Sequence, residues 1–279
     1  MSNAVFFRRM RMYLLYLVLF MGVIITIGPF VWMVLSSFKS GGEIVRTPPT
    51  FFPEEPTLNN YRRVLTGIPF VRYFFNSLYV STLTTIIVLF TSSLAGYIFA
   101  KFEFPFRETI FVVFLSTLII PFELIMTPLY LIFSNLRLIN TYTALILPYV
   151  VNVFGIYLVR QFMHQIPNDL IDAARIDGCS EFRIFAEIIV PQMKPALATL
   201  GIFTFMSQWN NYLWPLIAIN DMLLRPLQVG LAMVTQSQPT TTLYDISMAA
   251  STLAVGPVIV VFLIFQRWFI EGLTLTGLK

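Results

Sequence analysis

The sequence predicts an all-α polytopic membrane protein with six transmembrane helices, which form a single domain over residues 1–279. Three observations predict this: hydrophobic residues make up 57% of the chain, only 11% of residues are charged, and long apolar stretches recur. A soluble domain carries about 25% charged residues, so this chain has too few charges to cover a water-facing surface. Its single cysteine excludes an internal disulfide.

Six apolar stretches are candidates for membrane spans, since a helix needs about 20 residues to cross a hydrocarbon layer. They are residues 13–35, 76–99, 109–133, 142–159, 196–219 and 247–268. The fourth is the shortest and contains Pro148 and Asn152. The first follows Arg8, Arg9 and Arg11, and it is too long for a cleavable signal peptide. We therefore expect it to be retained as an anchor.

The distribution of positive charge predicts the orientation of the chain. With both termini in the cytoplasm, eleven Lys and Arg residues lie inside and seven outside, as the positive-inside rule favours. The outer segments are then 36–75, 134–141 and 220–246, and the inner ones are 100–108 and 160–195. The proline-rich segment 36–75 is expected to be irregular. We interpret the net charge of +4 as Lys and Arg residues in the loops that fix the membrane topology, and no nucleic-acid partner is expected.

The inner segment 160–195 holds nine of the 32 charged residues. Its pattern predicts a short helix with Asn168 as N-cap, a left-handed turn at Gly178, and a second short helix capped by Ser180 and limited by Pro191. Such an amphipathic pair has two interpretations. It is either an interfacial helix on lipid headgroups or a docking element for a cytoplasmic protein.

Small side chains mark two predicted packing faces. In the 160–195 segment, helical spacing joins Leu170, Ala173, Ala174 and Asp177, and small residues there permit another surface to approach closely. Arg183 and Glu187 form an expected i,i+4 pair on the second helix. In the second span, the small residues recur every fourth position, which is typical of helix–helix packing in membranes; they are Ser92, Gly96 and Ala100.

The stretch DAARIDG at 172–178, followed by IIVP at 188–191, resembles the EAA loop of ATP-binding-cassette (ABC) importer permeases. Further matches follow in order along the chain: Ser37-Phe38-Lys39, Asn76-Ser77-Leu78, Ala95-Gly96-Tyr97, Trp209-Asn210 and the tail Glu271-Gly272-Leu273-Thr274. Together they resemble the second permease subunit of carbohydrate-uptake systems of the maltose-transporter type.

The resemblance implies a type I ABC importer permease fold in the bacterial cytoplasmic (inner) membrane, with a cytoplasmic EAA coupling helix. It implies four protein partners: a second, similar permease, two ATPase subunits that bind ATP and Mg, and an extracytoplasmic solute-binding protein. The chain itself is expected to lie in lipid, to be no enzyme, and to hold no cofactor or metal. The residues implied to couple to the ATPase are Asp172, Ala173, Ala174, Asp177 and Gly178. Position 172, where the family usually has glutamate, is aspartate, whose side chain is one methylene shorter. Whether this position forms a salt bridge with the ATPase is therefore an open question.

Polar residues within the predicted spans are the other candidates for function. Glu123 is the one acidic residue near the middle of a span, where charge is costly. It either lines a pathway or, because Pro121 and Pro128 break the helix, reaches water or a freed backbone N–H. The run 207–212 is too polar to face lipid. Its amides and indole can bind a sugar or can bond a neighbouring helix, and helix packing with gate formation is the favoured interpretation. The candidate pathway or gate residues are Glu123, Gln208, Trp209, Asn210 and Asn211.

The function that the family resemblance implies is ATP-driven import of a carbohydrate, with a di- or oligosaccharide favoured and glycerol phosphate esters as the alternative. A self-contained secondary carrier would need coupling-ion sites and internal symmetry, and the sequence shows neither. A membrane enzyme would need catalytic residues, but the one histidine, His164, completes no metal motif or triad.

Overall fold

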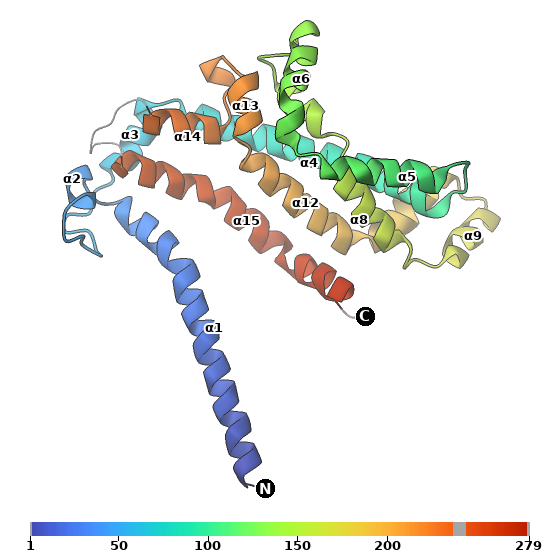
Figure 1. Ribbon diagram of the computed structural model, residues 1–279, viewed down its shortest axis with the longest axis horizontal. Coiled ribbons are helices and arrows are strands. Elements are labelled where there is room, and N and C mark those ends of the chain that lie inside the picture. The colour runs from blue at the N-terminus through green and yellow to red at the C-terminus, as the bar shows by residue number, and fades with distance from the viewer. Residues whose placement is uncertain (1, 237–243, 278–279) are drawn as a thin grey trace. The chain divides into compact units, whose positions relative to one another are not determined.

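The computed structural model describes the backbone of residues 2–236 and 244–277, which contains helices and no strand (Figure 1). Side chains are described for residues 7, 9–233 and 244–267, so the tail match at 271–274 lies outside them. The chain forms two compact units. Unit 1 combines residues up to Phe70 with Leu231–Val255, and unit 2 combines Val71–Gly230 with the chain from Gly256 onward.

Unit 1 contains α1 (Ser2–Ser36), α2 (Gly41–Ile44), α3 (Asn59–Gly67) and the start of α15 (Tyr244–Gly277). The apolar residues of α1 are exposed from Met10 to Val31, and no residue is buried in the apolar window that marks the span. They need a covering of lipid or protein, because exposed apolar surface of this extent is unfavourable in water.

The proline-rich segment 36–75 is less irregular than expected. Besides α2 and α3, it has a hydrogen-bonded core in which the amide Nδ2 of Asn60 donates to the carbonyl oxygens of Ser37 (2.9 Å) and Lys39 (2.7 Å). The buried amine of Lys39 donates to the carbonyl of Thr50. These contacts satisfy a buried charge and buried backbone groups, and they link residues too far apart in sequence for local patterns to show.

The remaining helices belong wholly or mostly to unit 2, except the last one, Leu227–Gln236, which is divided between the two units. They are α4 (Phe70–Lys101), α5 (Arg107–Ser116), α6 (Phe122–Asn135), α7 (Tyr142–Ile146), α8 (Val153–Met163), α9 (Asn168–Ile176), α10 (Glu181–Arg183), α11 (Val190–Gln192), α12 (Lys194–Trp209), α13 (Leu213–Ala218) and α14 (Leu227–Gln236). Short 3₁₀ turns cover Thr117–Ile119, Leu147–Tyr149 and Met222–Leu224, and a π-helix covers Ile184–Ile189.

Among the described residues, three helices are long and apolar enough to cross a membrane, and three bent pairs bring the number to as many as six. The unbroken ones are Arg9–Ser36, Phe70–Lys101 and Tyr244–Arg267. The stretch expected at 109–133 bends by 100° before Phe122, so that α6 points steeply away from α5 (Figure 1). Pro121 explains this break because it cannot donate a helical hydrogen bond. The stretch 142–159 bends by 42° after Tyr149.

The fifth stretch, 196–219, is two helices instead of one. The helix α12 ends at Trp209, and α13 starts at Leu213. The polar residues between them explain the break, since their side chains bond to neighbouring groups instead of facing lipid. A second bend of 80° separates α12 from the helical run Glu181–Gln192 before it.

The predicted packing face on the second span is confirmed. Ser92 is fully buried, and a Cβ added to Gly96 would lie 2.8 Å from the Cβ of Val159 on α8. A Cβ added to Gly155 would come similarly close to the side chains of Ser92 and Leu200. Small residues therefore let α4 and α8 approach until their backbones are nearly in contact.

Candidate functional site

The 160–195 segment folds as the helix–turn–helix that its sequence predicts. Gly178 has a φ of +80° at the end of α9, and the Ser180 hydroxyl accepts a hydrogen bond from the Arg183 N–H at 3.4 Å. Asn168 is not the N-cap, because Pro167 holds that position. The helical run that starts at Glu181 ends at Gln192, one residue after Pro191, close to the limit that this proline predicts.

The first helix of this segment has a buried face and an exposed face. Ile171 and Ala174 are buried in a cluster with Ile184, Phe185 and Ile189 of the second helix. Of the five predicted coupling residues, Ala174 thus points into the core of unit 2. The other four are exposed: Asp172, Ala173, Asp177 and Gly178.

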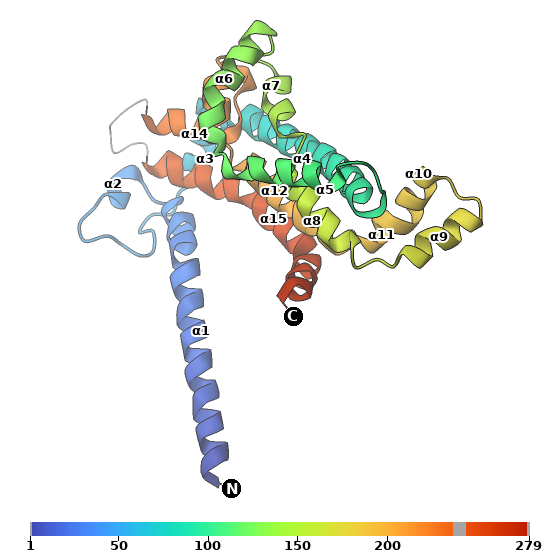
Figure 2. The same cartoon turned by 45° about the vertical axis from the view of Figure 1, so that its right-hand side comes forward.

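Sequence reasoning missed Ile176, which is 86% exposed and lies on the open side of α9. Its signal was available, because an isoleucine three residues after Ala173 and next to Asp177 continues the face predicted for docking. Figure 2 shows α9 and α10 next to each other near the end of α8, with α11 close by. An exposed apolar side chain among small and acidic residues suits contact with a protein surface.

Charged groups on the segment are largely paired within the chain. Arg175 contacts Asp172 at 3.2 Å and Glu181 at 2.6 Å. The expected pair Arg183–Glu187 is confirmed at 2.9 Å. The hydrogen bond to Glu181 raises the pKa of Arg175 above its ordinary value. The carboxylate of Asp172 therefore already has a cation within reach before any partner binds.

Three helix breaks meet at a second candidate site. The ring of Phe122, just after the α5–α6 break, lies 5.3 Å from the ring of Tyr149, where α7 gives way to α8. The Tyr149 hydroxyl accepts a hydrogen bond at 2.8 Å from Asn211, which lies between α12 and α13. The carbonyl freed at Val150 is satisfied by the Thr91 hydroxyl at 2.7 Å. Broken helices whose freed groups find partners inside the protein are typical of pathways in membrane transporters.

The structure separates the predicted pathway residues into two groups. Glu123 is exposed in the first turn of α6, and Asn210 and Asn211 occupy the α12–α13 break. Gln208 and Trp209 are buried, with the Trp209 ring 5.5 Å from the ring of Phe74 on α4. Sequence reasoning missed Tyr149, whose contacts join the three breaks, although Pro148 and Asn152 marked its surroundings.

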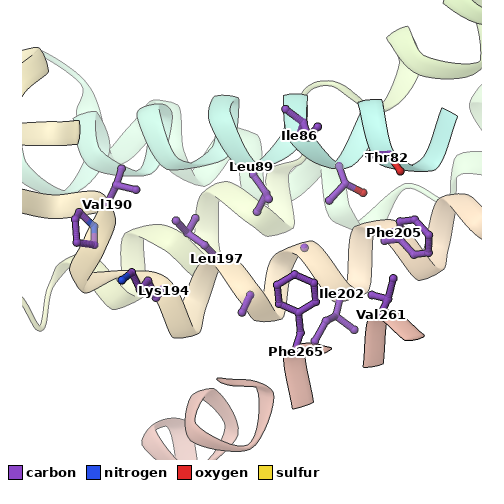
Figure 3. Close-up of a pocket in the computed structure, with 14 residues that line it drawn as sticks. Thr82, Ile86, Leu89, Val190, Lys194, Leu197, Ile202, Phe205, Val261 and Phe265 are labelled. Carbon is purple, nitrogen blue, oxygen red and sulfur yellow. The ribbon is translucent and has the colours of Figure 1, made fainter. Parts of the chain in front are cut away.

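A separate pocket of about 660 Å³ lies among α4, α12 and α15 within unit 2 (Figure 3). Leu89 and Leu197 point towards each other across it, while Val261 and Phe265 reach it from α15. Its polar groups are few; those that line it are Thr82, Thr85 and Lys194. Alkyl and aromatic walls of this kind fit an apolar occupant better than a sugar, whose hydroxyls need hydrogen-bond partners.

Comparison with known proteins identifies the family. Residues 92–274 match the model of the family described as "Binding-protein-dependent transport system inner membrane component". The chain is 40% identical to the arabinooligosaccharides transport system permease protein AraQ of Halalkalibacterium halodurans, with 91% of this chain and 92% of that protein covered. It is 34% identical to the lactose transport system permease protein LacG of Rhizobium radiobacter, with 95% and 96% covered.

A third relative, from Brucella abortus, is the sn-glycerol-3-phosphate transport system permease protein UgpE, at 31% identity with 94% of this chain and 95% of that protein covered. The fold matches a chain in the crystal structure of a bacterial ABC transporter involved in the import of the acidic polysaccharide alginate. The TM-score is 0.84 at 22% identity, with 94% of this chain and 97% of that chain covered. The chain thus belongs to the binding-protein-dependent transport system inner membrane components: it is the permease component of an ABC transporter, in which ATP is bound by partner ATPases.

Proposed function

We propose that the chain is one of two similar permease subunits of an ATP-driven importer for a di- or oligosaccharide. The observation that carries this proposal is its similarity along nine tenths of its length to relatives named for arabinooligosaccharides and lactose. Two ATPase subunits and an extracytoplasmic solute-binding protein complete the transporter. Both termini of this subunit lie in the cytoplasm, so that the 160–195 segment faces the ATPases.

Import of a glycerol phosphate ester is the second candidate, because a relative named for sn-glycerol-3-phosphate is 31% identical. The chemistry of the helix breaks favours the sugar. Tyr149 and Asn211 offer a hydroxyl and an amide that can exchange hydrogen bonds with sugar hydroxyls. The exposed carboxylate of Glu123 in the same region would repel a phosphate dianion.

The coupling role falls to the exposed side of α9 and the turn after it. Asp172, Ala173, Asp177 and Gly178 supply an acidic surface of low relief, to which a cleft in an ATPase can fit closely. The buried Ala174 contributes differently, since its small side chain lets α9 lie against the second helix of the segment. A bulky replacement of Ala174 is therefore expected to displace α9 and abolish uptake.

The three helix breaks form the gate in this proposal. A break can change its angle at a lower cost than a continuous helix, because fewer backbone hydrogen bonds have to be remade. The contacts of Tyr149 with Phe122 and Asn211 tie the three breaks together. We expect these contacts to hold the gate closed until ATP binding rearranges the segment below.

The test is reconstitution of the chain with its candidate partner permease, ATPases and binding protein in lipid vesicles. ATP hydrolysis should rise when binding protein loaded with an arabinooligosaccharide or lactose is added, and the labelled sugar should accumulate inside. Stimulation and uptake with glycerol 3-phosphate alone would instead favour the second candidate. Transport by the purified single chain under an ion gradient, without ATP, would contradict both.

A further inference from the structure

Three side chains link the 160–195 segment to the end of α4. The hydroxyl of Tyr97, on the last turns of α4, donates a hydrogen bond to Oε2 of Glu181 at 3.2 Å. The other carboxylate oxygen of Glu181, at the start of α10, accepts from Nε of Arg175 at 2.6 Å. Arg175 belongs to the last turn of α9. Together they connect α4, α10 and α9 in one chain of contacts, which we call the clasp.

A second contact holds the opposite end of α9 to the same helix. Nζ of Lys101, the last residue of α4, donates to the carbonyl of Ile166 at 2.6 Å and to Oδ1 of Asn168 at 2.7 Å. Lys101 is four residues after Tyr97, so both side chains leave α4 on the same face. The start and the end of α9 are therefore each fastened to α4.

The ring of Tyr97 is fixed in position by its surroundings. It is buried, and its centroid lies 5.4 Å from that of Phe102 and 5.6 Å from that of Phe185. A ring packed in this way cannot swing, so its hydroxyl follows any movement of α4. Arg175 also lies over the ring of Phe102, 5.9 Å from its centroid.

The clasp contributes little to stability. The side chains of Arg175 and Glu181 are 39% and 46% exposed, and ion pairs this exposed to water contribute little to stability. The fold of the segment has other supports: the turn at Gly178, the cap at Ser180 and the buried face of α9. What the clasp supplies in addition is a direct side-chain connection between α9 and a helix that crosses the membrane.

We propose that this clasp transmits movement of the coupling helix α9 to α4, with Tyr97 and Glu181 as positioning residues. The inference rests on the proposed function, in which α9 is seated on an ATPase. When the ATPases close, α9 is displaced, and Arg175 and Glu181 carry the displacement to the fixed ring of Tyr97. Without the Tyr97 hydroxyl, α9 moves with its ATPase, but α4 follows less completely.

The experiment measures sugar taken up per ATP hydrolysed in the full reconstituted transporter. Tyr97→Phe removes one hydroxyl and keeps the packed ring, and Glu181→Ala removes the central carboxylate. Both should leave the yield and melting temperature of the complex unchanged and lower the uptake per ATP several-fold. The double variant should be no worse than either single one, because both break the same connection.

The matched control is Glu187→Ala, which removes a carboxylate from the same helical run. Its pair with Arg183 also joins a guanidinium Nε to a carboxylate oxygen, at 2.9 Å, with both side chains 62% exposed. The hydrogen bonds and ion pairs of these two residues with other described residues stay within the segment. This control should keep the wild-type ratio of uptake to hydrolysis.

The outcomes separate the clasp from the proposed function. If wild type couples uptake to hydrolysis and Tyr97→Phe keeps the same ratio, the clasp is overturned while the proposed function stands. A lower melting temperature that accounts for the lost uptake would reduce Tyr97 to a structural role and also overturn it. If the wild-type complex shows no stimulated hydrolysis and no uptake, the proposed function fails, and the coupling role of the clasp fails with it.

Discussion

At the scale of single residues, Gly178 makes the turn after α9 possible because of its backbone conformation. Its φ of +80° is in the left-handed region, which costs other residues about 1–3 kcal/mol. An added Cβ would meet nothing within 4 Å, so only the backbone conformation opposes a substitution. Gly178→Pro, whose φ is fixed near −65°, should prevent the turn and abolish uptake in the reconstituted transporter.

The control for this prediction is Gly178→Asn, since asparagine tolerates the left-handed region better than other residues. It should retain most of the uptake. Normal assembly of Gly178→Pro with uptake equal to that of Gly178→Asn would show that the turn does not matter for coupling.

Gly96 matters because its missing side chain leaves room for α8, and not because of its backbone conformation. A Cβ at this position would lie 2.8 Å from the Cβ of Val159 and 3.1 Å from the backbone nitrogen of Arg160. Gly96→Ala should therefore separate α4 from α8 and destabilise the complex by about 1–3 kcal/mol, the usual cost of overpacking. The measurement is the melting temperature of the purified complex.

Gly201→Ala is the comparison for Gly96→Ala, because its Cβ would meet Leu89 at an ordinary 3.6 Å. It should leave the melting temperature close to that of wild type. Adding Val159→Ala to Gly96→Ala should restore part of the loss, because it removes Cγ1 of Val159, the atom nearest to the added Cβ. Equal melting of the two single glycine variants would contradict the close approach.

At the scale of elements, local signals predicted well and distant contacts could not be predicted. The turn at Gly178 and the cap at Ser180 act within a few residues, and both were correctly predicted. The hydrogen bond between Tyr97 and Glu181 joins residues 84 positions apart, and that between Asn211 and Tyr149 joins residues 62 apart. No spacing rule reaches so far.

The helix breaks show the same limit. Pro121 signalled that its stretch could bend, but the sequence contains nothing that sets the bend at 100°. In the fifth stretch, hydropathy averaged over many residues concealed the break after Trp209, because apolar residues lie on both sides of the polar run. Packing of Trp214 on Phe133 and its hydrogen bond to the carbonyl of Ala144 hold α13 in its own direction.

The hydrogen bond from Asn211 to Tyr149 joins the break in the fifth stretch to the break in the fourth, and it gives a prediction about the gate. Tyr149→Phe removes the acceptor for the amide of Asn211, and a net hydrogen bond contributes about 1 kcal/mol. If the gate is closed by this contact, the resting state should become less favoured. We expect ATP hydrolysis without binding protein to rise several-fold, measured on the reconstituted complex.

Tyr157→Phe is the matched control for the gate, since Tyr157 lies inside α8, after the break, and is 38% exposed. Its basal hydrolysis should equal that of wild type. A Tyr149→Phe complex with wild-type basal hydrolysis would show that the tie between the breaks does not restrain the gate.

At the scale of the whole molecule, the chain is built to be one part of an assembly. Its membrane-crossing helix Arg9–Ser36 has no buried residue in the window that defines it. The exposed side of α9 presents Asp177 next to Ile176, both open to solvent. A charge content of 11% leaves few groups to define orientation. The inner and outer segments must then be distinguished by a small number of Lys and Arg residues.

That orientation can be tested with cysteine labelling, because Cys179 is the one native cysteine and can be replaced by alanine. Glu55 and Glu103 are both exposed, and they belong to the predicted outer segment 36–75 and inner segment 100–108. In cells with a permeabilised outer membrane, an impermeant maleimide should label Glu55→Cys and leave Glu103→Cys unlabelled until the inner membrane is also opened. The positive-inside rule supports this result with a margin of only four residues, so the reverse labelling pattern would overturn the assigned topology. It would also place the 160–195 segment, with its clasp to α4, on the side opposite to the ATPases.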